Sequence, residues 1–403
     1  MKILFLTAVG IDDLSVRGIY TDLIRYFALQ GHDVYIMSPK ERRYKVPTNL
    51  KIQQGVHILN IKTLNIQKTN LLEKGLATVM LENQFLKAFK KYFGNIKFDL
   101  ILYSTPPITF SKLVRYVKER DRAFSYLLLK DIFPQNAVDL NFIKANGFLH
   151  RYFRRKETEL YRVSDCIGCM SPANVSYVAK NNSEVSTTKL EVNPNSLTPV
   201  DMSITPLQKE KIRKKYNIPS QAVVFIYGGN LGKPQGLDFL LTILLEYKNV
   251  KQVFFLIVGN GTESTKITNA IAKDDISNAQ LIQSLPKNEY DILLSSCDIG
   301  LIFLDSRFTI PNFPSRLLSY LECKMPVIAA TDTNTDIGIM IDANHFGKWV
   351  VSGQLKHFKE IADELITNPS LRQQFGWNGY QYMMDNYLVE NSYNIIMKHF
   401  SDV

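Results

Sequence analysis

The sequence predicts an α/β protein made of two doubly wound domains, each built on a parallel sheet. Short, wholly apolar runs recur along the chain, and most are followed by a glycine- or proline-marked turn and a segment of helical spacing. A length of 403 residues is too great for one ordinary core. The alternation stops once, over residues 195–205, where no strand pattern appears.

This interruption divides the chain into expected domains. Residues 1–198 form a first Rossmann-like domain and residues 199–378 a second one. Residues 379–403 belong to a terminal helix, expected over 376–400, that returns to the first domain. Two α/β domains of similar size predict a central cleft that the carboxyl ends of both sheets face.

The first domain opens with a βαβ unit. Residues 2–7 (KILFLT) form a strand, 7–18 a polar loop, 18–29 a helix and 34–37 a second strand, with a right-handed crossover. Later strands are expected at 56–61, 100–103, 124–129, 166–170 and 189–192. Helices are expected at 71–93, 109–119 and 147–162.

The second domain repeats the alternation after a short charged helix over 208–216. Its strands are expected at 223–227, 253–258, 281–285, 299–304, 327–329 and 349–351. The terminal helix carries an aromatic stripe, which is typical of core packing.

Composition narrows the class of protein. Hydrophobic residues make up 45% and charged residues 21%, as in ordinary globular proteins, and the net charge of +10 favours an acidic partner. Four cysteines suggest no disulfide framework, so a reducing compartment fits. The apolar start is too short for a signal peptide, and no apolar run is long enough to span a bilayer. We therefore expect a cytoplasmic protein.

The loop after the strand at 223–227 is the first candidate site. Gly228, Gly229 and Asn230 end the strand, and Lys233 lies in the turn before an amphipathic helix. Glycines let the backbone approach a ligand, and a helix N-terminus attracts anions, so a nucleotide diphosphate is the expected ligand. The spacing fits neither a Walker A loop nor a dinucleotide fingerprint. The alternative is a tight structural turn without a ligand.

A second candidate cation follows the strand at 299–304. Pro314 and Ser315 are helix-start signals, with Ser315 expected as the cap, and they place Arg316 at the mouth of the next helix. Loops after parallel strands share one sheet edge, so Lys233 and Arg316 are expected to clamp one diphosphate. The alternative is that Arg316 is an ordinary surface residue.

Two features of the first domain point to other roles. Asp131 ends the strand at 124–129, where it would orient a sugar hydroxyl or act as a base; the alternative is a turn-capping aspartate. Basic residues are interleaved with aromatic ones in two helices, which suits an anionic lipid surface. A solvated basic face and a nucleic-acid surface remain open as alternatives. These basic residues are Lys87, Lys90, Lys91, Arg151, Arg154, Arg155 and Lys156.

Other chemistries lack support in the sequence. Cys166 and Cys169 lie within a strand pattern rather than at a helix start, and no second Cys or His pair completes a zinc site. The six histidines are scattered, and no Gly-x-Ser-x-Gly elbow occurs. We therefore expect no metal site and no hydrolase triad.

Four segments of the second half together resemble a known family. YGGNLGKPQGLDFLL, LIVGNGTE, SLPKNEYDILLSSCDIGLIFL and PSRLLSYLECKMPVIAA, in this order and spacing, resemble GT-B glycosyltransferases of the family-4 type. The most similar subgroup is the fucosamine-transferase-like enzymes of capsule and O-antigen assembly. The first half agrees more loosely, through KILFLT, RGIYTDLIRYFALQGHDVYIMSP, KDIFPQNAV and VNPNS.

The resemblance implies that the second domain holds a nucleotide-sugar donor and the first an acceptor, with retention of configuration and no required metal. It places donor phosphates beside Gly228, Gly229, Lys233 and Arg316, and the base beside the main chain of Leu285. The loop residues Asn230, Asn312, Phe313 and Ser315 complete the donor site. From the first domain, Arg17 and Gly18 would approach the donor.

The chain departs from the family pattern at three positions. The family's paired glutamates, which hold the donor sugar and the ribose, fall on Pro311 and Ser319. Glu322 lies one helical turn beyond Ser319 and is the candidate substitute for the second glutamate. Gln235 stands where the family usually has lysine.

The resulting expectation is a retaining transferase that uses a UDP-sugar, either an N-acetylated hexose or a 6-deoxyhexose. The acceptor would be linked to polyprenyl diphosphate, at the inner face of the cell membrane, in capsular or surface polysaccharide biosynthesis. Two alternatives remain: a nucleotide-sugar epimerase on the same scaffold, and a non-catalytic basic protein that binds membranes or nucleic acid.

Overall fold

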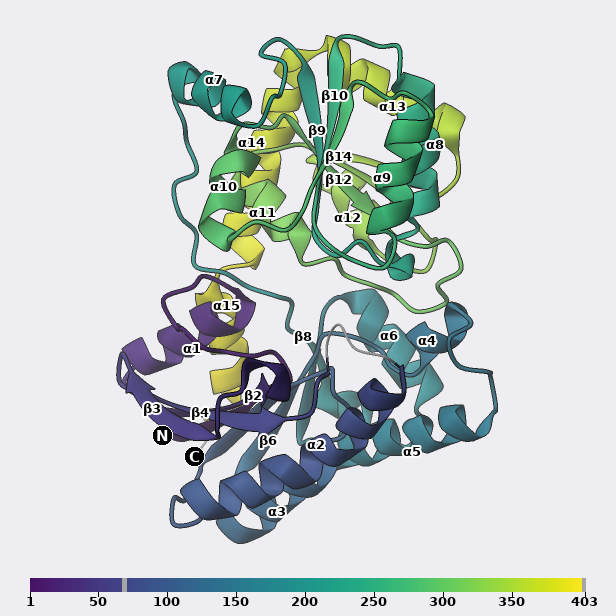
Figure 1. Ribbon diagram of the computed structural model, residues 1–403. Helices are drawn as coiled ribbons and strands as arrows, with labels where there is room; N and C mark the ends of the chain where they lie inside the picture. Colours follow the sequence, from purple (N-terminus) through teal and green to yellow (C-terminus); the bar gives the residue numbers. More distant parts are fainter. Residues whose placement is uncertain (67–70, 401–403) are drawn as a thin grey trace. The chain divides into compact units, whose positions relative to one another are not determined.

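The computed structural model describes residues 1–66 and 71–400 and divides into two compact units (Figure 1). Unit 1 comprises Met1–Leu197 and Val389–Val403, and unit 2 comprises Thr198–Leu388. Each unit is an α/β body with one sheet, so the predicted fold class is confirmed. Among the described residues, no helix is both long and apolar enough to cross a bilayer.

Unit 1 is built on an eight-stranded sheet in the order β3-β4-β2-β1-β5-β6-β7-β8. All neighbouring strands are parallel except β3 and β4. The strands are β1 (Lys2–Leu6), β2 (Asp33–Glu41), β3 (Asn49–Gln53), β4 (Val56–Thr63), β5 (Leu100–Ser104), β6 (Phe124–Leu129), β7 (Cys166–Cys169) and β8 (Leu190–Val192). The helices are α1 (Ile19–Leu29), α2 (Leu71–Tyr92), α3 (Ser111–Asp121), α4 (Gln135–Asp139), α5 (Phe148–Val163) and α6 (Pro172–Asn181).

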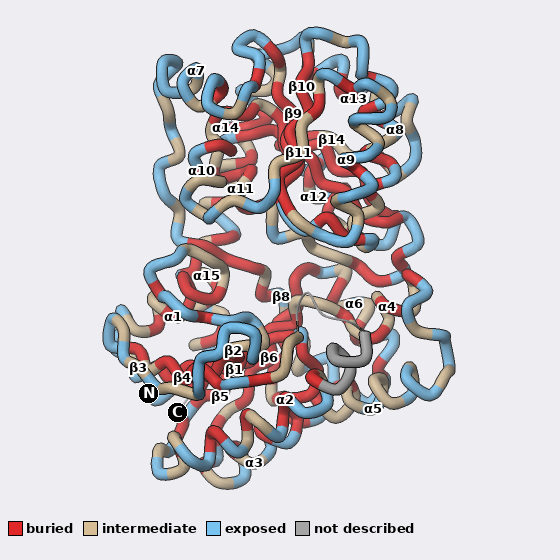
Figure 2. The backbone as a smooth tube through the Cα atoms, viewed as in Figure 1, coloured by how far each residue is buried: buried red, intermediate tan, exposed pale blue. Residues whose placement is uncertain are grey.

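The central strands of this sheet form the core of unit 1. Every residue of β5 and β7 is buried, as are all but the first residues of β1 and β6 (Figure 2). Each fully buried large aliphatic or aromatic side chain contributes about 1.5–3 kcal/mol, so these apolar runs account for the position of the sheet. Strand β3 was not predicted, because it is an antiparallel edge strand whose residues are half-buried or exposed and no wholly apolar run marks it.

Unit 2 is built on a six-stranded, wholly parallel sheet in the order β11-β10-β9-β12-β13-β14. The strands are β9 (Val223–Gly228), β10 (Val253–Val258), β11 (Ala279–Ile282), β12 (Ile299–Phe303), β13 (Val327–Thr331) and β14 (Gly347–Val351). The helices are α7 (Pro206–Lys215), α8 (Leu237–Tyr247), α9 (Ser264–Lys273), α10 (Lys287–Ser295), α11 (Arg316–Glu322), α12 (Ile337–Ala343), α13 (Leu355–Thr367) and α14 (Pro369–Asn386).

The strand order of unit 2 reverses between β9 and β12. The chain moves outward from β9 through β10 to β11, then returns to the other side of β9 as β12 and continues to β14. In such sheets, ligands bind beyond the carboxyl ends of the strands at this switch point. The loops that follow β9 and β12 are therefore the first place to look for a site.

The end of the chain differs from the single helix expected over 376–400. Helix α14 stops at Asn386, and a new helix, α15 (Val389–Met397), packs on α1 in unit 1. The buried Tyr387 at the break packs against Phe313 and Tyr382, which holds this turn in unit 2. In unit 1, the ring of Tyr393 lies 4.9 Å from that of Phe27.

Candidate functional site

The loops after β9 and β12 meet at the carboxyl edge of the sheet in unit 2. The Asp305 amide donates to the Pro234 carbonyl at 3.1 Å. Gly236 has a positive φ of 57°, and a Cβ there would lie 3.0 Å from the Asp305 backbone. This close approach needs glycine at position 236 and fixes the two loops against each other.

The glycines that end β9 make room for side chains of the protein itself. A Cβ on Gly228 would lie 1.9 Å from the Tyr290 hydroxyl, and one on Gly229 would lie 3.4 Å from Arg316 Nη2. The Gly228 amide donates to the Tyr320 hydroxyl at 3.2 Å, and the Gly229 amide donates to the Val258 carbonyl at 2.9 Å. These two amides thus already have partners within the protein.

Arg316, the first residue of α11, is packed against the glycine loop. Its Nη2 donates to Gln235 Oε1 at 2.6 Å, and its guanidinium carbon lies 4.2 Å from the centre of the Tyr227 ring. Its Nη1 is buried without a hydrogen-bond partner among the described residues. Arg316 also forms no ion pair with any residue that the structure describes.

A buried guanidinium without a counter-ion is costly, since charge taken out of water must be paired. The unpartnered Nη1 and the unbalanced charge both favour an anion at this edge of the sheet. Arginine offers a planar fork that matches phosphate oxygens. The arrangement is therefore suited to binding a phosphate group.

Lys233 lies on the same edge as Arg316. It begins the short 3₁₀ turn Lys233–Gln235, is exposed, and is two residues from the side chain that holds Arg316. The structure thus brings the two predicted cations to adjoining loops.

Ser315 precedes α11 as expected, but its side chain makes no capping hydrogen bond, so that prediction is wrong. Its backbone already has helical angles, whereas a capping residue is normally extended.

The other residues predicted for the donor site are distributed around these loops. The Asn230 carbonyl accepts from the Tyr227 hydroxyl at 2.7 Å, and Asn312 Nδ2 is buried without a partner among the described residues. Phe313 packs on Tyr387. Leu285 lies in the loop between β11 and α10, because β11 ends three residues before it rather than including it as predicted.

Ser319 and Glu322 both lie on α11, but their surroundings differ. Ser319 is half-buried, whereas Glu322 is buried and accepts a hydrogen bond from the Val200 amide at 2.8 Å. One oxygen of the Glu322 carboxylate is therefore engaged by the segment that enters unit 2. The substitution of Glu322 for the missing family glutamate stays a prediction.

The residues predicted in unit 1 lie near the carboxyl ends of its strands. Arg17 is half-buried in the loop before α1, and the Gly18 amide donates to Asp22 Oδ1 at 3.2 Å. Asp131 follows β6, and Asn136 Nδ2 donates to both of its oxygens at 2.9 and 2.8 Å. Burial raises the pKa of Asp131 to about 6, against the opposing effect of Asn136.

The sequence analysis did not select Lys130 or Asn136, although both lie in the quoted KDIFPQN segment. Lys130 Nζ donates to the Asn193 carbonyl at 3.2 Å, and burial lowers the pKa of its amine to about 7. The signal that would have found Lys130 is its place between a fully apolar strand and an aspartate, where a charged side chain is unusual.

The raised pKa of Asp131 predicts a pH-dependent effect of Asp131→Asn on stability. The folded state keeps the proton up to about pH 6, whereas the unfolded chain loses it near its ordinary pKa of 3.8. Ionisation therefore lowers wild-type stability as pH rises through this window, by on the order of 1–3 kcal/mol. Asparagine cannot ionise, so the variant should melt higher than wild type at pH 7.5 and equally at pH 3.5. A constant difference in melting temperature across pH would contradict the raised pKa.

The cysteines are structural rather than reactive. Cys166 and Cys169 are buried, and burial raises the pKa of each thiol to about 12. Among the described residues, one group has metal-ligand spacing, formed by Cys166, Glu191 and His399 in unit 1. Lys398 Nζ already lies 2.6 Å from the Glu191 carboxylate, and the Tyr126 hydroxyl donates to it at 2.7 Å. Metal independence stays a prediction.

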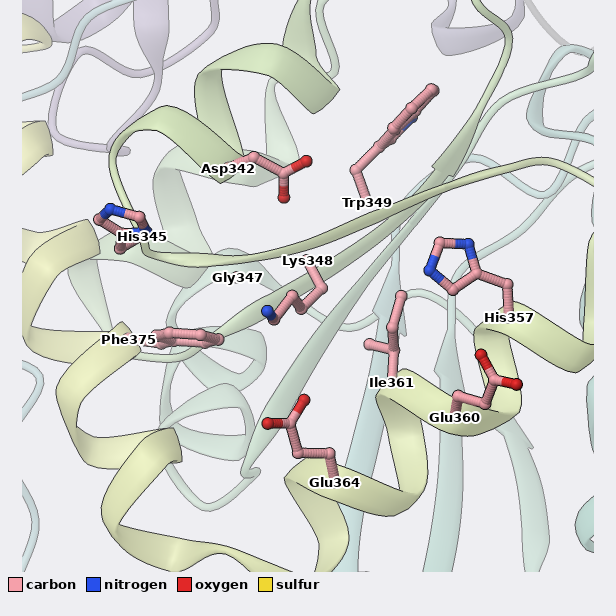
Figure 3. Close-up of a pocket in the computed structure, with 10 residues that line it drawn as sticks. All are labelled: Asp342, His345, Gly347, Lys348, Trp349, His357, Glu360, Ile361, Glu364 and Phe375. Carbon is pink, nitrogen blue, oxygen red and sulfur yellow. The ribbon is translucent and has the colours of Figure 1, made fainter.

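Unit 2 also has a pocket of about 510 Å³ beside its edge strand β14 (Figure 3). Its lining includes none of the predicted site residues. Gly347 and Lys348 begin β14, so the pocket lies toward the amino ends of the parallel strands, opposite the edge with Arg316. Lys348 points toward Phe375, with Nζ 5.7 Å from the ring centre. The acidic residues that line the pocket argue against a phosphate ligand there, because they would repel it.

Comparisons with known sequences found similar proteins. Residues 208–382 match the family model of glycosyl transferases group 1. The probable glycosyltransferase WbjE from Pseudomonas aeruginosa is 26% identical over 293 residues, which cover 70% of this chain and 68% of WbjE.

Solved structures share the whole fold. Sucrose-phosphate synthase from Thermosynechococcus elongatus has a TM-score of 0.76 at 14% identity, over 100% of this chain and 99% of that one. HepE from Anabaena, in complex with UDP-glucose, has a TM-score of 0.71 at 15% identity, over 100% of both chains. At such identities, the likeness shows the fold, which is that of GT-B glycosyltransferases.

Proposed function

We propose that this GT-B glycosyltransferase, whose residues 208–382 match the group 1 glycosyl transferases, moves a sugar from a UDP-sugar to a lipid-linked saccharide. We propose further that the anomeric configuration is retained and that no metal is required. The sugar would be an N-acetylated hexose or a 6-deoxyhexose, and the product would enter capsular or surface polysaccharide. The fucosamine-transferase-like enzymes are the proposed subgroup.

The observation that carries the donor assignment is the buried, unpartnered Nη1 of Arg316. No carboxylate of the described residues pairs with this guanidinium, so a bound ligand can supply the counter-ion. Lys233 adds a second cation on the adjoining loop. HepE, a protein of the same fold, has been solved with UDP-glucose. These facts support a nucleotide diphosphate at the carboxyl edge of β9 and β12.

The cations would act when the bond between the sugar and the diphosphate breaks. Negative charge then grows on the β-phosphate, and Arg316 and Lys233 would stabilise it more than they stabilise the ground state. In the proposed step, the bond from C1 to the phosphate oxygen breaks as the acceptor oxygen bonds to C1 on the same face. The acceptor proton passes to the leaving phosphate. Asp131 of unit 1 is the proposed contact for a sugar hydroxyl.

A thermal-shift screen with UDP-, GDP- and dTDP-sugars tests the donor. A ligand at 100 times its dissociation constant stabilises the folded state by about 2.7 kcal/mol. We expect a UDP-sugar to raise the melting temperature of unit 2, which the two tryptophans, Trp349 and Trp377, report by fluorescence. If no nucleotide sugar raises the melting temperature, and polyanions bind with a steep dependence on salt, the non-catalytic alternative is favoured.

For the acceptor, we propose that unit 1 contacts an anionic membrane surface through the start of α5. Phe148 is 79% exposed and Leu149 55% exposed, with Phe142 nearby in sequence at 56%. Arg151 and Arg155 are exposed on the same helix. Apolar side chains flanked by arginine suit the interface of an anionic bilayer.

The structure changes which arginines belong to this surface. Arg154 was predicted with Arg151 and Arg155, but it pairs with the buried carboxylate of Glu157 and donates to Asn182 Oδ1 at 3.0 Å. It therefore stabilises unit 1 instead of lying free on the helix. Arg155 pairs with Glu159 at 3.1 Å but keeps a side chain that is 82% exposed.

Substituting the apolar pair tests the membrane contact. We expect Phe148→Ser with Leu149→Ser to weaken binding to anionic vesicles about a hundredfold or more in a sedimentation assay, because about 1.5–3 kcal/mol of burial per side chain is lost and each 1.4 kcal/mol is a factor of about ten. The matched control is Lys211→Ser with Lys214→Ser, which removes two exposed charges from α7 of unit 2. Equal sedimentation of the α5 variant and wild type would remove this helix as the contact.

A further inference from the structure

We infer that Tyr227 and Gln235 are positioning residues, which hold Arg316 with neutral groups so that its Nη1 and its whole charge face the donor diphosphate. This inference rests on the proposed function of Arg316. Neither residue is assigned contact with the donor or with the reacting atoms.

Tyr227 supports the guanidinium from one side. It ends the apolar part of β9, is fully buried, and places its ring 4.2 Å from the guanidinium carbon of Arg316. Its hydroxyl donates to the Asn230 carbonyl at 2.7 Å and lies 3.3 Å from Gln235 Oε1. The ring therefore forms a fixed platform, and an aromatic face attracts a cation without neutralising it.

Gln235 fixes the guanidinium in its own plane. Its Oε1 accepts from Arg316 Nη2 at 2.6 Å, across 81 positions of sequence. A carboxylate would make the same contact but would also cancel the charge. An amide oxygen sets the geometry and leaves the positive charge for a ligand.

The remaining neighbours of Arg316 are also neutral. Gly229 lies beside the guanidinium, and a Cβ there would be in van der Waals contact with Nη2 at 3.4 Å. The titratable neighbours of Arg316 are the tyrosines 227, 290 and 320, and burial raises the pKa of each, so they are uncharged at neutral pH. The guanidinium is thus clamped from several sides but paired with no anion of the described residues.

The decisive variant is Gln235→Glu, with UDP as the probe. The new carboxylate should pair with Arg316, so we expect at least a tenfold loss of UDP affinity by calorimetry at pH 8. A carboxylate paired with a guanidinium has a pKa below its usual value, so the loss should persist between pH 8 and pH 5. A packing defect would instead lower the melting temperature of the ligand-free variant. Gln235→Leu, which removes the bond without adding charge, should lose a smaller factor of about three to ten.

Tyr227 is tested by separating its ring from its hydroxyl. Tyr227→Phe keeps the platform and should bind UDP within about threefold of wild type, whereas Tyr227→Leu should bind about tenfold more weakly. For the variants at positions 227 and 235, kcat should fall more than KM rises, since Arg316 is assigned to stabilise the transition state. The matched control is Tyr216→Leu, which removes a ring under Lys215 in α7. Melting temperatures of all variants are measured without ligand.

The possible results distinguish a failure of the proposed function from a failure of the positioning inference. If wild type fails to bind UDP or any nucleotide sugar, the proposed function fails. If wild type binds and Arg316→Ala does not, while Gln235→Glu and Tyr227→Leu bind as wild type does, only the positioning inference fails. A loss in Gln235→Leu as large as that in Gln235→Glu also overturns it, because the added charge would then have no effect of its own.

Discussion

Replacing Arg316 with alanine is expected to reduce transfer by 10²- to 10³-fold in kcat, equivalent to about 2.7–4 kcal/mol of transition-state stabilisation. The side chain is assigned to the charge that grows on the leaving phosphate. Removing it takes away a half-buried cation with a buried Nη1, at the carboxyl edge of β9 and β12, that the described residues leave without a counter-ion. Steady-state rates with a UDP-sugar and acceptor measure the effect.

The fold should survive this substitution, because the protein no longer buries an uncompensated charge. We expect the melting temperature of Arg316→Ala to stay close to that of wild type, while protection by UDP is lost. Lys251→Ala is the matched control, since it removes one exposed cation at the start of β10.

Lys233→Ala should also be severely impaired in transfer, although the exposure of the Lys233 side chain implies a smaller loss of rate than in Arg316→Ala. Wild-type turnover in both site variants would refute the diphosphate clamp.

The edge of the sheet that carries this site could be predicted because it depends on local patterns. Residues 223–227 and 299–304 are apolar runs that can only be buried strands, and parallel strands place their following loops at the same edge. Lys233 follows the first of those strands by six residues, and Arg316 follows the second by twelve, at the start of the next helix. Their place on adjoining loops therefore followed from the strands and the helix start.

The contacts within the site could not be predicted in the same way. The bond between Arg316 and Gln235 joins residues 81 positions apart, and nothing local to either residue specifies its partner. Glycines 228 and 229 were interpreted as making room for a ligand, but their neighbours are Tyr290 and Arg316. A glycine pattern shows that something approaches the backbone closely, without showing whether it is ligand or protein.

Boundary errors have a similar origin. The aromatic pattern continues through Tyr387, so the terminal segment reads as one helix, although α14 and α15 pack on different units. The Glu322 carboxylate accepts from Val200, a residue 122 positions earlier, which no helical spacing would indicate. Contacts with residues distant in the sequence therefore determine both the end of α14 and the surroundings of Glu322.

The largest effect on stability is expected at Arg213, which anchors α7 to the sheet of unit 2. This side chain is 3% exposed, pairs with Asp298 at 2.6 Å and donates to the carbonyls of Ser296, Ser220 and Ala222. Arg213→Met should destabilise unit 2 by about 3–5 kcal/mol, because the three carbonyls lose their donor and Asp298 keeps only Lys209 as a cationic partner.

Urea unfolding followed by tryptophan fluorescence measures this loss, since Trp349 and Trp377 both lie in unit 2. Lys211→Met, an exposed change on the same helix, should unfold within about 0.5 kcal/mol of wild type. Adding Asp298→Asn to Arg213→Met should recover part of the loss, because the buried residue is then neutral. Unfolding of Arg213→Met at the wild-type midpoint would mean that α7 is not held through this buried ion pair.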